Sequence, residues 1–319
     1  MLSAHAGIVP CPAERLEGLK PTQSGRPGPD TYSMRSFVAA ALASVALFAS
    51  SSGVAGGSET RPRRILAVTI NLTEMGERDA SDPSDVRLFA RRLDARVPHP
   101  PDIVLAQEVR LRSAQTTAAA LTKRFGRRFA IGVAPAREPI WERKRRDGTV
   151  VEMSQESAVI FNASTMKMTS RPRYVRTSFW DDGRKAVRKH PYATFRELGS
   201  HMRVTVAGVH LFMQKKIGSR RRAGHARRVA AAVERQAASA GSSFEVLGGD
   251  FNGSMRVDGE PTRFYRTLVS WRRYTDTIQV PGVDYIFARG HGLTVAAAGV
   301  DHRDKAYSDH AFRWSLFGR

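Results

Sequence analysis

Residues 244–252 read Phe-Glu-Val-Leu-Gly-Gly-Asp-Phe-Asn, and this stretch decides how the whole chain is interpreted. Its first four residues are mostly apolar and predict a short strand that opens into two glycines. In an extended chain alternate side chains point to the same side, so Asp250 and Asn252 are predicted to face one metal ion or phosphate group together. The stretch therefore predicts a strand that ends at a polar site.

Short apolar segments with polar ends recur on both sides of this stretch. Helical spacing of apolar residues after Ser84 predicts a helix over 84–97, and two more are predicted over 113–125 and 220–239. Strands outnumber helices, and two of them form a hairpin through Gly199-Ser200, which favours an α/β fold with mixed sheets over a parallel βαβ fold. The predicted strands besides 244–247 are 64–70, 103–106, 157–161, 193–198, 203–211, 283–287 and 312–316.

Polar side chains with metal-binding or proton-transfer chemistry stand where these strands end. Taken singly, each is more often a solvated strand edge or a packed histidine. Together, the carboxylates and asparagines supply the oxygen ligands that Mg²⁺, Mn²⁺ or Ca²⁺ prefer, and the histidines can transfer protons. The set is Asn71, Glu108, His210, Asp250, Asn252, Asp284, Asp309 and His310.

The same segments carry a resemblance to a known group of enzymes. Gly248-Gly249-Asp250-Phe251-Asn252 and Ser308-Asp309-His310 are specific when they occur in one chain. Over about residues 65–318 the chain resembles the endonuclease/exonuclease/phosphatase superfamily, typified by deoxyribonuclease I. The resemblance implies a four-layer α/β sandwich of two packed mixed β-sheets flanked by helices. Matching segments in the same order are 68–72, 105–109, 156–161, 208–211 and 283–287.

The resemblance implies that one group of residues holds the metal ion and the phosphate. Glu108 resembles the metal-binding glutamate of the superfamily, and Asn71 and Asp309 resemble its neighbours at the metal or the phosphate. Asn252 resembles the residue that contacts phosphate. The implied cofactor is Mg²⁺, with Mn²⁺ or Ca²⁺ as alternatives. Thr73 stands where some branches carry an acidic residue, so a second metal ion stays open.

A second group is implied to activate water and move protons. Asp250 resembles the residue that orients the attacking water, and His310 the histidine at the scissile phosphate, oriented by Asp284. His210 resembles the second histidine of the nuclease branch, with Glu156 as its carboxylate partner. A carboxylate that accepts from an imidazole N–H fixes its tautomer and stabilises the charged ring. The implied reaction is in-line hydrolysis of a phosphate ester, with the acid and base roles of the histidines open.

The charge of the chain bears on the substrate. It has 319 residues, 51 Lys+Arg against 30 Asp+Glu, and a formal net charge of +21, which indicates an anionic partner. A hydrophobic fraction of 41% excludes a disordered chain. No apolar run approaches the ~20 residues of a membrane span. The Arg-rich composition of a GC-rich genome is the alternative explanation of the charge.

Basic segments with aromatic residues between them favour nucleic acid as the substrate. Segments 137–146, 171–189 and 215–228 are predicted to lie around the site, the first as part of a polar loop over 137–149. Loop cations would follow a phosphate backbone, and aromatic rings would stack on bases. The alternatives are a solvated basic surface, a sphingomyelinase-like or inositol-phosphate phosphoesterase, and a basic binding protein with a silent site. The predicted nucleic-acid contacts are Arg143, Lys144, Arg145, Arg146, Arg184, Arg188 and Arg221.

The N-terminal region is predicted to be separate from the fold. Residues 34–56 combine a short basic start, an apolar run and a small-residue end, which is typical of a secretory signal peptide cleaved near Ala55 or Gly56. Residues 1–33, which include the single cysteine, are then an over-long gene start. We expect one secreted domain over 57–319, with no stable membrane insertion after cleavage. Its net charge is +20, because residues 1–56 hold four cations and three anions. An uncleaved N-terminal anchor is the alternative.

Overall fold

The described part of the chain lies within one compact unit. A computed structural model describes residues 64–72, 83–136, 141–144, 150–153, 156–181, 184–301 and 308–319. By contacts the chain divides into Met1–Ser58 and Glu59–Arg319, and all described residues belong to the second unit. The predicted signal peptide, the stretch 1–33 and Thr73 lie outside the described residues.

No helix within the described residues is both long and apolar enough to cross a membrane.

The first sheet has six strands in the order β16-β17-β1-β2-β6-β3. β1 and β2 are parallel, while β17 pairs with β1, and β6 with β2, in the antiparallel sense. The sheet is therefore mixed, and the carboxyl ends of β1 and β2 lie at the same edge. The strands are β1 (Ile65–Asn71), β2 (Ile103–Gln107), β3 (Phe129–Val133), β6 (Ser157–Asn162), β16 (Thr294–Val300) and β17 (Arg313–Gly318).

The second sheet follows the order β14-β15-β11-β10-β9-β7, and β8 pairs with β9. Its central strands β10 and β11 are parallel, so their carboxyl ends also lie at one edge. β15 runs antiparallel to β11 and pairs Asp284 with Asp250. The strands are β7 (Met166–Met168), β8 (Arg173–Asp181), β9 (Arg184–Glu197), β10 (Arg203–His210), β11 (Phe244–Asp250), β14 (Thr275–Asp276) and β15 (Asp284–Gly290).

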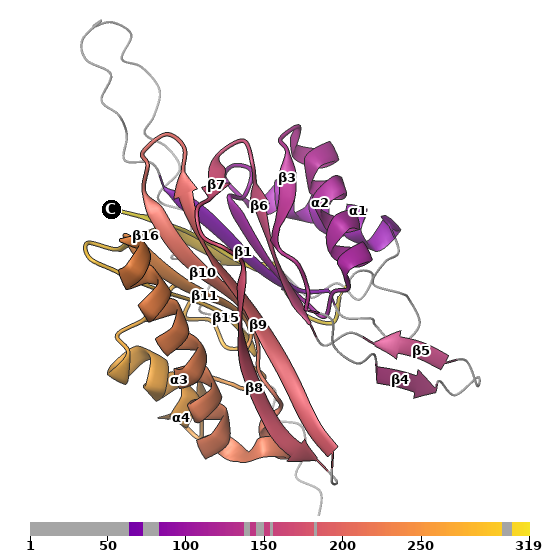
Figure 1. The fold of residues 1–319 in the computed structure, drawn as a ribbon, viewed down its shortest axis with the longest axis vertical. Coiled ribbons are helices and arrows are strands. Elements are labelled where there is room, and N and C mark those ends of the chain that lie inside the picture. Colours follow the sequence, from indigo (N-terminus) through magenta and orange to yellow (C-terminus); the bar gives the residue numbers. More distant parts are fainter. Residues whose placement is uncertain are drawn as a thin grey trace, which may run out of the picture. The chain divides into compact units, whose positions relative to one another are not determined.

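The two sheets pack against each other and helices cover their outer faces (Figure 1). The inner core joins Leu105 and Val159 of the first sheet to Val206 and Phe244 of the second. The resulting four layers confirm the predicted α/β sandwich of two mixed sheets. The first sheet is covered by α1 (Pro83–Arg96) and α2 (Leu111–Phe125), and the second by α3 (Gln214–Ala240), α4 (Arg263–Arg266) and the π-helical turn Thr267–Trp271.

The predicted loop over 137–149 is wrong in its middle part. Strand β4 (Trp141–Lys144) pairs antiparallel with β5 (Val150–Met153), so this segment contributes to a hairpin. The sequence holds a signal for it, since Asp147-Gly148 precedes the β-branched pair Val150-Val151. A second short hairpin joins β12 (Arg256–Val257) and β13 (Glu260–Pro261).

The basic segment 171–189 is also not a loop. It forms β8 and the first part of β9, which are paired from Arg173 with Tyr192 to Asp181 with Arg184. The predicted strand 193–198 is thus the end of a 14-residue strand, and its hairpin with β10 is confirmed. The β alternation was obscured in the sequence, because the exposed face of the hairpin holds the aromatic Tyr174 and Trp180 and the buried face holds the charged Arg188.

The glycines after Leu247 allow two backbones to approach closely. A Cβ on Gly248 would lie 2.4 Å from Leu105 Cδ1 in the facing sheet. Gly249 has a φ of 150°, and a Cβ there would lie 1.8 Å from the carbonyl oxygen of Val209. The second contact is with backbone, which cannot rotate away.

We expect Gly249→Ala to lower the free energy of unfolding by at least about 2 kcal/mol, as for an overpacked and strained site. Denaturant unfolding of the full chain measures this. Gly224→Ala in α3 is the matched control, because no atom lies within 4 Å of its added Cβ and a helix interior favours alanine by about 1 kcal/mol. Equal stabilities of the two variants would contradict the packing described for Gly249.

Candidate active site

The predicted site residues converge at one edge of the sandwich. Asn71 ends β1 and Glu108 follows β2, while His210 ends β10 and Asp250 ends β11. Parallel pairing within each sheet brings these four carboxyl ends together. The antiparallel partners bring in the rest, because Asp284 begins β15 opposite Asp250 and His310 precedes β17 beside β1.

At the centre, an amide and an imidazole lie between two carboxylates of different sheets. Asn71 Nδ2 is 3.3 Å from Glu108 Oε1 and 3.4 Å from Asp250 Oδ2. His210 Nε2 is 3.6 Å from the same Glu108 oxygen and 3.5 Å from the same Asp250 oxygen. Glu108 takes a φ of 55°, a left-handed conformation that a non-glycine residue keeps only where the surrounding structure holds it.

Asp250 and Asn252 meet through a turn, which corrects the prediction of an extended chain. β11 ends at Asp250, and Asn252 takes a φ of 51°. The Asn252 N–H donates to Asp250 Oδ1 at 2.7 Å, and its side-chain amide donates to Asp250 Oδ2 at 3.0 Å and to the Leu211 carbonyl at 2.7 Å. Asn252 therefore fixes the orientation of the Asp250 carboxylate.

Asp284 orients His310, as the resemblance implies. His310 Nδ1 lies 2.9 Å from Asp284 Oδ2, so the ring donates through Nδ1 and Nε2 faces Asp309 at 3.6 Å. Ser308 connects this pair to the first sheet, since its hydroxyl accepts the His310 N–H at 3.0 Å and donates to the Asn71 carbonyl. The Ser308 contacts explain why the serine belongs to the motif.

Burial and like charge set the protonation of the site. Burial, and then the charge of Asp284, raises the pKa of Asp250 to about 7. Burial lowers the pKa of His310, but the hydrogen bond and charge of Asp284 outweigh it and raise the pKa to about 9. Burial also raises the pKa of Glu108. Near neutral pH the site thus pairs a charged imidazolium with a carboxylate close to its titration midpoint.

Arg188, predicted to contact nucleic acid, is instead buried beside the central carboxylates. Its Nη1 donates to the Leu211 carbonyl at 2.6 Å, and its guanidinium lies 4.7 Å from the centre of the Phe212 ring. Burial lowers its pKa to about 10, against the raising effect of Glu108 and Asp250. The permanent charge of arginine tolerates this burial better than lysine would.

The other predicted nucleic-acid contacts are distributed differently. Arg221 is exposed on α3. Arg143 and Lys144 lie on β4 and Arg184 on β9, but their side chains fall outside the described part, as do Arg145 and Arg146 entirely.

Glu156 is buried at the start of β6, next to the glutamate of the site. Its carbonyl accepts the Val109 N–H at 3.2 Å, which ties it to the residue after Glu108. Its predicted role as the partner of His210 stays a prediction.

Sequence reasoning missed the residues that hold the loops of the site. Arg222 of α3 is buried and donates to the Asn252 carbonyl at 2.5 Å. The Tyr285 hydroxyl lies 3.1 Å from the Gly253 carbonyl and 2.6 Å from the Gly282 carbonyl. It therefore connects the loop that follows Asp250 with the loop that precedes Asp284. Arg313 donates to two carbonyls of the same loop, at 2.7 and 2.8 Å. Only contacts between distant segments reveal these roles.

His190 was missed as well, and it supports His210 from behind. It is fully buried, its Nδ1 accepts the His210 N–H at 3.2 Å, and its Nε2 lies 2.9 Å from Thr177 Oγ1. Burial, and then the charge of Arg188, lowers its pKa to about 3. A neutral His190 that donates through Nε2 fits both contacts.

The donor set fits a hard divalent cation near Glu108. The partly buried carboxylate of Glu108 accepts a hydrogen bond from the Asn71 amide, and the negative charge of Asp309 repels it. A cation would relieve this repulsion between the two carboxylates. Asp250, Asp284 and His310 also place ligand atoms within 4.8 Å of one another. That trio fits less well, because His310 would first have to lose the proton that Asp284 stabilises.

Comparison with known proteins places this fold. No protein-family model matches the sequence, and no curated protein matches it either. The human Nocturnin catalytic domain with bound sulfate anion aligns with a TM-score of 0.56 and 16% identity, covering 80% of this chain and 94% of that one. An endonuclease/exonuclease/phosphatase family protein from Leptotrichia buccalis aligns with a TM-score of 0.56 and 15% identity, covering 80% of this chain and 100% of that one.

A third solved structure is the mannosyl-6-phosphatase of Bacteroides thetaiotaomicron, with a TM-score of 0.53, 15% identity, and coverage of 79% and 99%. At such identities the likeness concerns the fold. The chain therefore has the endonuclease/exonuclease/phosphatase fold, which confirms the fold that the resemblance implied.

Asp284→Asn should lower the pKa of His310 well below about 9, because the hydrogen bond and charge of Asp284 are lost and only the charges of Asp250 and Asp309 still oppose the effect of burial. Ring NMR of the EDTA-treated protein measures it. Because the pKa of His310 is raised in the folded state, its charged form contributes to the free energy of unfolding. This contribution is fully present below about pH 6.5 and is lost as the pH rises through about 9. The stability difference between wild type and variant should therefore shrink over that interval. The exposed Asp258→Asn should leave the titration unchanged, and an equal shift in both would contradict the pair.

Proposed function

We propose that this chain is a metal-dependent phosphoester hydrolase and that its substrate is nucleic acid, cleaved at internal phosphodiester bonds. The observation that carries the proposal is the Asp284–His310 pair at 2.9 Å beside the Asp250 carboxylate, at the edge where both sheets end. The fold supports it, because a solved neighbour is a mannosyl-6-phosphatase and another holds a sulfate anion, which resembles phosphate in shape and charge.

In the proposed mechanism, Asp250 accepts a proton from the attacking water. A pKa of about 7 makes its carboxylate a fitting base at neutral pH. Asn252 fixes this carboxylate through two donated hydrogen bonds, at 2.7 and 3.0 Å. The water oxygen forms a bond to phosphorus while the ester P–O bond on the opposite side breaks.

His310 stabilises the charge that develops on the phosphoryl group and donates its Nε2 proton to the leaving oxygen as the ester P–O bond breaks. With a pKa of about 9, His310 is protonated at neutral pH. Because Asp284 accepts the hydrogen bond from Nδ1, the Nε2–H on the other side of the ring points away from the Asp284 carboxylate. Arg188 adds a fixed positive charge beside Glu108 and Asp250. Glu108, Asn71 and Asp309 would hold Mg²⁺, or Mn²⁺ or Ca²⁺, which neutralises charge on phosphate oxygens when bound.

Nucleic acid is proposed over other phosphate esters because of the charge. Part of the net charge of +21 is carried by exposed arginines, among them Arg173 and Arg176 on β8 and Arg220, Arg221, Arg227 and Arg228 on α3. The mannosyl-6-phosphatase neighbour favours a phosphomonoesterase as the second candidate. A sphingomyelinase-like activity and a silent binding protein are further alternatives that the same assays separate.

Export is a further part of the proposal. The apolar run within 34–56, with its basic start and small-residue end, supports a secretory signal, and translation from Met34 would make 1–33 dispensable. N-terminal sequencing of protein from the culture medium tests this. A mature chain that starts near Gly56 supports export, and an intact N-terminus in the cell extract overturns it.

We expect the wild type to cleave plasmid and oligonucleotide with Mg²⁺ and to lose this activity with EDTA. His310→Ala should lower kcat at least ~10²-fold, the scale for losing a proton-transfer group. The exposed His291→Ala is the matched control and should retain full activity. Hydrolysis of 4-nitrophenyl phosphate or sphingomyelin without nucleic-acid cleavage would contradict the nuclease proposal.

Glu108→Gln should raise the Mg²⁺ concentration for half-maximal activity at least ~10-fold, because loss of metal-site partners already costs 10–100-fold in affinity. Mn²⁺ binding by calorimetry provides a readout independent of catalysis and should weaken in parallel. Glu260→Gln, on the exposed β13, is the control. Unchanged Mn²⁺ affinity in Glu108→Gln would remove this residue from the proposed metal site.

A further inference from the structure

The β8–β9 hairpin continues beyond the sheet to which it belongs. β9 pairs with β10 only from Arg196 to Tyr192, whereas its pairing with β8 runs on to Arg184. The hairpin therefore extends past the end of β10, which is His210, and Figure 1 shows the ends of β8 and β9 running on together. Its two faces have different chemistry.

One face packs on the protein. Phe179 of β8 and Ala186 of β9 are cross-strand partners, and both join a small buried cluster with Phe212 and Ile217 of the α3 region. The Phe179 and Phe212 rings meet at 4.5 Å. This cluster fixes the free part of the hairpin to α3 and uses its apolar side chains, so they are not available to an external partner.

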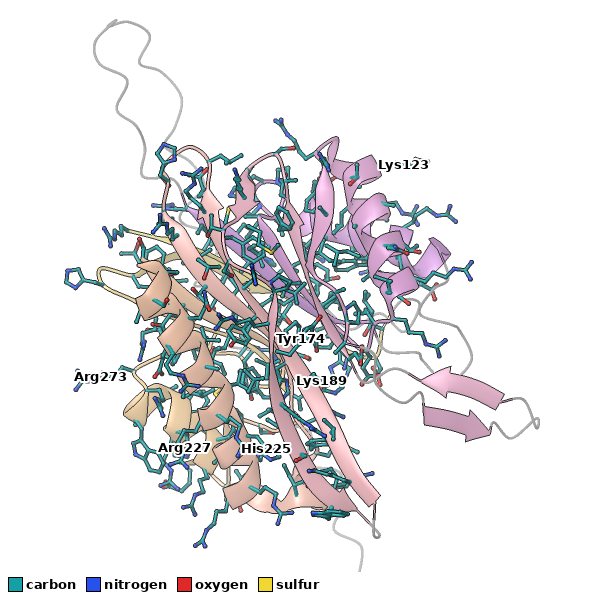
Figure 2. The ribbon with its side chains drawn as sticks, viewed as in Figure 1. Lys123, Tyr174, Lys189, His225, Arg227 and Arg273 are labelled. Atoms are coloured by element: carbon teal, nitrogen blue, oxygen red, sulfur yellow. The ribbon has the colours of Figure 1, made fainter. Side chains whose placement is uncertain are left out.

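The opposite face carries cations and aromatic rings. Arg176 lies across from Lys189, and Trp180 across from Lys185. Arg176 and Lys185 are exposed, the Trp180 side chain is 69% exposed, and Tyr174 is 39% exposed. Figure 2 shows Tyr174 and Lys189 close together on the hairpin. We call Tyr174, Arg176, Trp180, Lys185 and Lys189 the hairpin track.

The hairpin track lies on the face of the sheet that bears the active site. Val206 of β10 pairs with Ala193 of β9, and both enter the core between the sheets. Side chains two apart share a face, so His210 follows Val206 on β10, and Lys189 and Lys185 follow Ala193 on β9. The four residue steps from Lys189 to Lys185 span about 13 Å at 3.3 Å per residue.

We propose that the hairpin track binds a single-stranded part of the nucleic-acid substrate and that Trp180 stacks on one of its bases. This rests on the proposed function, since the track starts beside the site where a phosphodiester would be cleaved. Arg176, Lys185 and Lys189 match a phosphate backbone in charge. About 13 Å corresponds to roughly four nucleotides at a rise of 3.4 Å, and to fewer in a stretched strand.

Single-stranded substrate follows from the exposure of Trp180. A base in a duplex is already stacked on both sides, so its ring can meet an indole only after leaving the helix. A lipid surface fits less well, because the larger apolar residues of the hairpin face α3 and a single tryptophan remains outside. The enzyme should therefore prefer single-stranded or locally unpaired substrate and cut at a fixed distance from the base on Trp180.

The test compares Trp180→Ala with Trp180→Phe and with Trp271→Ala. Trp271 is the matched control, since it is 64% exposed but lies in the helical layer on the other face of the second sheet. Affinity for a short thymidine oligonucleotide is measured in EDTA by fluorescence anisotropy of the full chain. Base stacking on an aromatic ring is worth about 1–3 kcal/mol, so Trp180→Ala should weaken binding about 10-fold. Trp180→Phe should restore most of it, and Trp271→Ala should change little.

Hydrolysis of bis(4-nitrophenyl) phosphate distinguishes this inference from the proposed function. The small diester cannot reach Trp180, so its kcat/KM should be equal in wild type and Trp180→Ala. If the wild type hydrolyses this diester and Trp180→Ala binds the oligonucleotide as tightly as the wild type does, only the hairpin-track proposal is wrong. If Trp180 contributes to binding but nothing is hydrolysed, only the hydrolase proposal is wrong. Loss of binding to phosphatidylglycerol vesicles in Trp180→Ala, with unchanged oligonucleotide affinity, overturns the track in favour of a lipid surface.

Discussion

The site depends on two carboxylates, one buried and one partly buried, that lie close together at the junction of the sheets. Glu108 comes from the first sheet and Asp250 from the second, and His210 Nε2 lies 3.6 and 3.5 Å from their facing oxygens. Two like charges taken out of water repel strongly unless partners or protons compensate them. Much of the surrounding structure supplies that compensation, through the Asn71 amide, the Arg188 guanidinium and the imidazolium of His310.

The site requires two residues in an uncommon backbone conformation, and contacts with the core hold them in it. Glu108 and Asn252 both take left-handed φ angles, of 55° and 51°. Non-glycine residues keep such angles only where surrounding contacts determine them. The loop at Asn252 is held by Arg222, whose guanidinium lies 4.8 Å from the centre of the Phe264 ring in the helical layer. The aromatic core under the second sheet thus supports the geometry of the carboxylate above it.

The sequence predicted the fold and which polar residues come together at its edge, because both leave local signals. Two glycines precede Asp250 because neither position has room for a side chain. A Cβ on Gly248 would clash with the other sheet, and a Cβ on Gly249 would clash with a backbone carbonyl. The β8–β9 hairpin was missed because its charged residues, Arg188 on the buried face among them, obscure the β alternation of Arg184–Glu197. The buried positions of Arg188 and Arg222 could not be predicted, because an arginine is ordinarily a surface residue and only distant segments bury these two.

The charges around the site also bear on which phosphate ester fits. Glu108, Asp250, Asp284 and Asp309 bring four negative charges when ionised, and Arg188, Arg222 and His310 bring three positive ones. One divalent cation makes the sum +1, and it would lower the pKa of Asp250 and so keep this carboxylate ionised. A phosphodiester carries one negative charge and brings the sum to zero. A phosphomonoester carries up to two near neutral pH and leaves an uncompensated negative charge in a buried place. Under the proposed function, this charge balance favours a diester over a monoester as the substrate.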